Sequence, residues 1–215
     1  MFAFTIAEES DPYMELRDAL TQISEIRLQM ARTEVFRGIR AMPVAFSGVL
    51  ALAAAGFQAF SMREPTREWG LYLGIWIGAA VVSFAAAGAE MAIRVWNSRS
   101  NVTREITWLV VEQFVPCLVA GGLLTFVVVR FAQEVLWMLP GLWQILYSLG
   151  IFAACRLLPR QTFGVAVFYL ATGLTCLAFA RGEYALSPWA MGLPYGVGQL
   201  LAAAVLYRTL ECSDE

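Results

Sequence analysis

Apolar residues dominate the chain beyond residue 42, in long runs separated by short polar stretches. A helix of about 20 apolar residues is long enough to cross the hydrocarbon core of a bilayer. The pattern therefore predicts an all-α fold, a polytopic membrane bundle of six transmembrane helices. The expected spans are 43–61, 70–91, 106–129, 138–158, 162–180 and 188–207. They form one domain, 42–208, followed by a short acidic tail, 209–215.

The segment before the first span, residues 1–41, has a different pattern. Asp11 and Pro12 are typical of the start of a helix. An apolar stripe with charges of both signs around it follows; it consists of Leu16, Leu20, Ile23 and Met30. Residues 12–40 therefore predict an amphipathic helix. One interpretation is a cytoplasmic or interfacial helix beneath the bundle. The other is a docking helix for a second copy, or for a membrane or cytoplasmic protein.

Composition supports a membrane protein. Of 215 residues, 59% are hydrophobic and 15% are charged, and the mean hydropathy is +0.63. Soluble domains are nearer to half apolar and a quarter charged. The net charge of −2, with no broad basic face, excludes nucleic acid as a partner. The lipid bilayer is the partner that the composition predicts.

The arginine distribution predicts the orientation, because cytoplasmic loops of membrane proteins carry an excess of basic residues. With the N-terminus inside, four arginines fall in outer loops: Arg63, Arg67, Arg130 and Arg181. Eleven fall in inner segments: Arg17, Arg27, Arg32, Arg37, Arg40, Arg94, Arg99, Arg104, Arg156, Arg160 and Arg208. We therefore expect both termini in the cytoplasm of a bacterium, with the bundle in its inner membrane.

Missing residue types exclude several chemistries. All 15 basic residues are Arg, so a Lys nucleophile, a His-containing zinc site and a His-ligated haem are excluded. No Asp lies in a predicted span, which excludes a paired-aspartate protease. The four cysteines are scattered, with no C-x-x-C pair: Cys117, Cys155, Cys176 and Cys212. We expect a protein that is not an enzyme, with no catalytic residue, metal or cofactor; the alternative is a membrane lipid enzyme that uses only Glu, Tyr, Cys or Arg.

Carboxylates interrupt two of the predicted spans. Glu112 and Gln113 stand side by side in the third span, and Glu90 lies at similar depth in the second, near the cytoplasmic interface. An ionisable residue inside a span marks a functional site by default. Glu112, Glu90 and Gln113 are therefore candidates for binding a ligand or a proton.

A structural alternative for these carboxylates is an Arg–Glu cluster that fixes the inner ends of the helices. Arg94 follows Glu90 by four residues, the favourable order for an ion pair on a helix. Arg40 and Arg156 end nearby helices on the same side. Arg94, Arg156 and Arg40 are therefore the candidate ion-pair partners.

The sixth span contains the most irregular sequence of the chain. Between Ser187 and Gln199 it holds two Pro and three Gly. This pattern predicts a kinked or partly unwound helix, and unwound helices with polar lining occur at ligand and transport sites. The alternative is a kinked but continuous helix whose polar groups bond across the bundle. Tyr195 and Gln199 are the candidate ligand-binding residues here.

Together these features predict a non-catalytic integral membrane protein that binds or transports a small solute, lipid or proton within its helix bundle. The alternative is a membrane sensor or accessory subunit that acts through its N-terminal helix.

Overall fold

The computed structural model describes residues 41–63, 67–97, 101–155, 158 and 160–210. The helix predicted over 12–40 and the end of the acidic tail lie outside the described residues. In the described ranges every element is helical. The order is α2 (Ala41–Ser61), α3 (Trp69–Asn97), α4 (Asn101–Phe131), η1 (Gln133–Met138), α5 (Leu139–Ala154), α6 (Thr162–Phe179), η2 (Gly182–Tyr184) and α7 (Pro188–Leu210).

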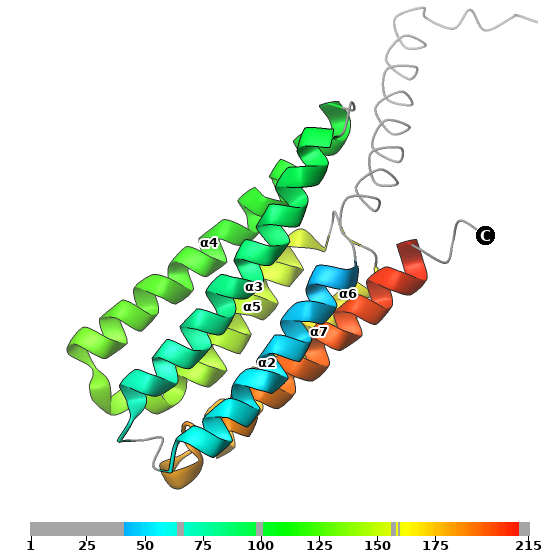
Figure 1. Cartoon of the computed structure of the whole chain (residues 1–215). Helices are drawn as coiled ribbons and strands as arrows, with labels where there is room; N and C mark the ends of the chain where they lie inside the picture. Colours follow the sequence, from blue (N-terminus) through cyan, green and yellow to red (C-terminus); the bar gives the residue numbers. More distant parts are fainter. Residues whose placement is uncertain (1–40, 64–66, 98–100, 156–157, 159, 211–215) are drawn as a thin grey trace, which may run out of the picture.

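Six of these helices, one including η1, are long and apolar enough to cross a membrane. The prediction of an all-α, six-span bundle is confirmed, and the protein is a multi-pass integral membrane protein. The described chain begins and ends at the same end of the bundle, because α2 starts there and α7 finishes there (Figure 1).

Helices α3 and α4 are longer than the spans predicted for them. They contain 29 and 31 residues, or about 44 and 47 Å at 1.5 Å per residue. The hydrocarbon core of a bilayer is only about 30 Å thick. The hairpin of α3 and α4 therefore projects beyond the other helices at the end where α2 begins (Figure 1).

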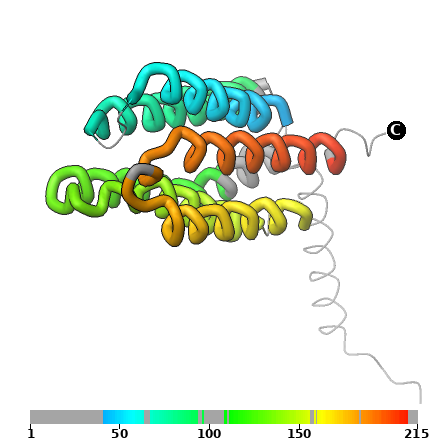
Figure 2. Tube along the Cα trace, turned by 90° about the horizontal axis from the view of Figure 1, so that it is seen from below, coloured from blue at the N-terminus to red at the C-terminus, as the bar shows by residue number. Residues whose placement is uncertain are grey.

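The helices pack as an open arrangement rather than as a closed ring. Helix α2 packs between α3 and α7, and α5 packs between α4 and α6. Contacts of α7 with α6 and α5 join the two halves. Helices α3 and α4 stand at the free ends of this arrangement and make few contacts with each other. Figure 2 shows the bundle from below, with the helices lying lengthwise.

Small residues bring α2 and α7 close together. A Cβ atom added at Gly192 would overlap the side chain of Ala55, and one added at Gly48 would lie 3.1 Å from the Gly196 carbonyl oxygen. Glycine at such positions lets helix backbones approach in a membrane. Of the alanines at four-residue spacing on α2, Ala55 is fully buried, whereas Ala59 faces outward.

The sixth span is a continuous helix, which agrees with the second of the two interpretations, a continuous helix whose polar groups bond across the bundle. Pro194 lies inside α7 and has no N–H, so the Ala190 carbonyl loses its partner within the helix. Gln144 of α5 replaces that partner, because its Nε2 donates a hydrogen bond of 2.9 Å to the Ala190 oxygen. A neighbouring side chain thus satisfies the freed backbone group, and the helix need not unwind.

Candidate functional site

A cavity of about 500 Å³ lies inside the bundle, walled by α2, α3, α4, α5 and α7. Its lining on α4 runs from Phe114 to Thr125, which corresponds to about 17 Å along the helix. Most of the lining is apolar, and none of the described side chains that line it is charged. The volume is in the range of small-molecule sites, which are mainly apolar with a few fixed polar groups.

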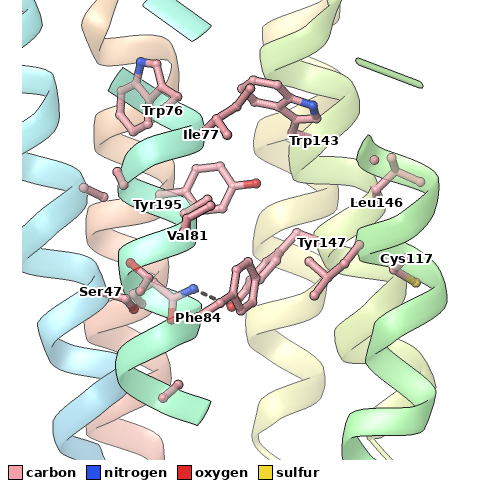
Figure 3. A pocket seen from close by; sticks show the side chains of 18 of the residues that line it. Ser47, Trp76, Ile77, Val81, Phe84, Cys117, Trp143, Leu146, Tyr147 and Tyr195 are labelled. Atoms are coloured by element: carbon pink, nitrogen blue, oxygen red, sulfur yellow. Dashed lines mark hydrogen bonds between the residues drawn. The ribbon is translucent and has the colours of Figure 1, made fainter. Parts of the chain in front are cut away.

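Three polar side chains at the back of the cavity supply such groups. Gln199 of α7 donates from Nε2 to the hydroxyl oxygen of Tyr147 on α5. The hydroxyl of Tyr195, one turn away on α7, points into the cavity (Figure 3). Within the described part of the chain no hydrogen bond engages that hydroxyl. Both tyrosines therefore have a phenolic proton available to a molecule in the cavity.

Aromatic packing fixes the position of these groups. The rings of Tyr147, Tyr169 and Tyr195 contact one another pairwise, with centroids 4.9, 5.3 and 5.6 Å apart. Phe114 of α4 packs edge-on against Tyr147 at 5.3 Å. Pairs at such distances favour tilted or edge-on arrangements and add to the stability of the core. The hydroxyls are thus held on side chains from three packed helices.

Two tryptophans line the cavity, Trp76 on α3 and Trp143 on α5. Trp76 donates from Nε1 to Gln58 Oε1 at 2.8 Å, and Gln58 donates from Nε2 to the Leu186 carbonyl at 2.8 Å. Trp143 donates from Nε1 to the Thr125 hydroxyl at 2.9 Å. These bonds satisfy the buried indole N–H groups, which leaves the apolar faces of the rings for the cavity.

Tyr195 and Gln199 line the cavity together, so the structure brings these two predicted site residues to one place. The three predicted residues on the other helices lie elsewhere. Glu112 is exposed on α4, while Glu90 on α3 and Gln113 on α4 are partly buried. None of the three belongs to the cavity lining.

The depth of the carboxylates agrees with an interfacial position. From Glu112 to Phe131 at the end of α4 the helix rises about 29 Å, and from Trp69 to Glu90 on α3 about 32 Å. These rises are close to the thickness of the hydrocarbon core, about 30 Å, so both carboxylates lie near its border at the end of the bundle where α2 begins. Pro116 also removes the N–H that would bond to the Glu112 carbonyl, which leaves a further acceptor at this level.

The proposed ion-pair cluster cannot be placed. The side chains of Arg94, Arg156 and Arg40 lie outside the described residues. Glu90 interacts with a neighbouring group and is not free. For Glu112, the part of the chain that the structure describes provides no ion pair or hydrogen bond to the carboxylate. The roles predicted for these residues stay predictions.

Four side chains that shape the cavity and its supports were not predicted from the sequence: Gln58, Trp76, Trp143 and Gln144. A signal for the two glutamines was present. An isolated amide in an apolar span needs partners, and Pro194 necessarily frees the carbonyl of Ala190. In contrast, the pattern does not indicate which helix face a tryptophan occupies. No group of His, Cys, Asp and Glu side chains within the described ranges could hold a metal ion.

Comparison with protein-family models, with curated proteins and with solved structures finds no match to this chain.

Proposed function

We propose that this protein is a non-catalytic membrane protein that binds a small molecule in the cavity between its helices. The observation that carries the proposal is the combination of a cavity of about 500 Å³ with the unengaged hydroxyl of Tyr195 inside it. A well-packed interior contains few spaces larger than a water molecule. A space of this size, with fixed hydrogen-bonding groups, is typical of a ligand site.

The lining also supports binding rather than catalysis. Among the residues that the structure describes around the cavity there is no carboxylate, thiolate–base pair or other group positioned for acid–base work. A charge-dependent role for Glu112 or Glu90, such as proton binding, has no support from this cavity, because both lie at the inner border of the membrane.

We further propose the orientation that the arginines predict, with the end that contains residues 41 and 210 in the cytoplasm of a bacterium. The exposed Trp96 and Trp108 near that end are in keeping with an interfacial position. A role as a sensor or accessory subunit through residues 12–40 stays a prediction.

The proposal can be tested by native mass spectrometry of the full chain released from mild detergent. Wild-type protein should carry a bound small molecule, seen as a discrete added mass. Gly122 lines the cavity, and Gly78 on α3 does not; a Cβ atom at either position meets open space. Gly122→Phe should therefore fold and lose the added mass, whereas Gly78→Phe should retain it. Identical spectra for wild type and Gly122→Phe would contradict the proposal.

A further inference from the structure

The wall of the cavity is open on one side. Lining residues on α2 and α7 are buried, as Ala51 and Met191 show at 7% and 4% exposure. Lining residues in the middle of the two free helices are exposed instead, with Val81 of α3 at 60% and Leu118 of α4 at 37%. Because α3 and α4 make few contacts with each other, the cavity is a groove that opens between them.

The opening of the groove lies within the part of α4 that spans the membrane. Residues 114–125 of α4, which border the groove, lie within the span Val111–Phe131. The inner end of the groove is narrowed by Phe84 of α3 and Phe114 of α4, whose ring centroids are 6.5 Å apart. The opening between the two helices thus faces the hydrocarbon core of the bilayer. A molecule that reaches the groove sideways must come from the lipid phase.

The depth of the polar side chains in the membrane restricts which kind of molecule can reach them. Tyr195 and Gln199 lie about 10 and 17 Å along α7 from its outer end at Pro188, which places them on either side of the bilayer midplane. A charged headgroup at that depth, in a groove with no charged lining, would be strongly unfavourable. The headgroup of a phospholipid stays at the membrane surface and therefore cannot reach these side chains.

The hydrogen-bonding groups decide which polar atom the molecule carries. Tyr147 already accepts a bond from Gln199, so its own hydroxyl proton is available for donation. The Tyr195 hydroxyl, aimed into the groove, offers a second proton (Figure 3). Two donors in an apolar groove match an oxygen acceptor, such as a carbonyl, whose two lone pairs can accept both bonds.

We propose that the ligand is an uncharged, lipid-soluble molecule whose carbonyl or hydroxyl oxygen is held by Tyr195 and Tyr147 at the bilayer midplane, and that it enters from the bilayer between α3 and α4. This inference rests on the proposed function and adds the chemical class and the route. The molecule is either a component of the membrane itself or a hydrophobic compound that has dissolved in it.

The experiment uses the full chain in liposomes and the neutral photoreactive ketone 4-octylbenzophenone, whose carbonyl is its only polar group. The charged analogue 4-benzoylbenzoate is the control probe. After photolysis, adducts of the ketone should map to 76–87 and 114–125. Gly122→Phe should lower this labelling at least about fivefold, and Gly78→Phe should leave it unchanged. Tyr195→Phe and Tyr147→Phe should each raise the half-saturating concentration about fivefold to tenfold, the loss expected for one hydrogen bond.

Tyr207→Phe is the matched control for the tyrosines, because Tyr207 is exposed on α7 away from the groove. Labelling by the ketone that is indifferent to Tyr195→Phe and Tyr147→Phe would overturn the inference. If the anion 4-benzoylbenzoate also labels the groove, and Gly122→Phe abolishes that labelling, the inference of an uncharged ligand is overturned. The proposed function would remain intact in that case. If no probe responds to Gly122→Phe, both proposals fail. Extraction of the unlabelled protein with organic solvent then separates a membrane component, which co-purifies, from a compound that must be supplied.

Discussion

The pairing of Gln144 with the carbonyl that Pro194 exposes gives a prediction of defined sign and size. Gln144 is fully buried, and its Nε2 is the donor that satisfies the Ala190 oxygen. Gln144→Leu removes this donor while roughly preserving volume. A buried carbonyl without a partner costs about 1–3 kcal/mol in soluble proteins, and hydrogen bonds in a membrane average about 0.6 kcal/mol. Gln144 Oε1 has no partner among the described residues, so its removal offsets part of the loss. We expect a net destabilisation of about 1 kcal/mol.

A second substitution tests the cause. In Pro194→Ala the new backbone N–H at position 194 can bond to the Ala190 oxygen, as in an ordinary helix. Gln144→Leu should then cost almost nothing, or stabilise slightly, because it removes only the unpartnered Oε1. The double-mutant cycle should thus give a coupling of about 1 kcal/mol.

The assay is equilibrium unfolding by sodium dodecyl sulfate in mixed micelles, applied to wild type, both single variants and the double variant. Gln133→Leu is the matched control, since Gln133 is exposed and bonds only to a carbonyl of the preceding helical turn, at Val129. It should change the free energy of unfolding by less than about 0.5 kcal/mol. If Gln144→Leu is equally destabilising with and without Pro194, the reasoning is refuted.

Three further predictions follow from the packing and from the membrane border. Gly192→Ala should lower the free energy of unfolding by about 1–3 kcal/mol in the same assay, because its Cβ meets Ala55; Gly56→Ala, in open space, should not lower it. Trp76→Phe should cost about 1 kcal/mol by leaving the buried Gln58 Oε1 without its donor, and an unchanged free energy of unfolding would count against that bond. Glu112→Gln should leave both the free energy of unfolding and ketone labelling unchanged, since Glu112 is exposed outside the cavity; a loss of labelling would return this residue to the site.

The number of the spans was predictable because hydrophobic length largely decides whether a helix can cross a bilayer. The errors occur where polar residues extend a helix beyond the membrane. Helix α3 continues to Asn97 and α4 starts at Asn101, because helix formation does not stop at the membrane border. Near Pro194 the sequence left local unwinding and a continuous helix both open, and only the contact with Gln144 on another helix decides for the second.

The candidate site was only partly predictable for a related reason. Tyr195 and Gln199 share one helix face by their spacing of four, so their proximity follows from sequence. Their partner Tyr147 is 52 positions from Gln199, and only the packing of α5 against α7 brings it there. Glu112 attracted attention because charge is conspicuous in an apolar run. Its depth explains its presence without placing it in the cavity.

The central claim is that the groove between α3 and α4 holds an uncharged molecule against Tyr195. An experimental density map of the protein in lipid nanodiscs tests it most directly. We predict an elongated non-protein density between Val81 and Leu118 that reaches hydrogen-bonding distance of the Tyr195 hydroxyl. Helices α3 and α4 packed together, with side chains filling the groove, would contradict the account.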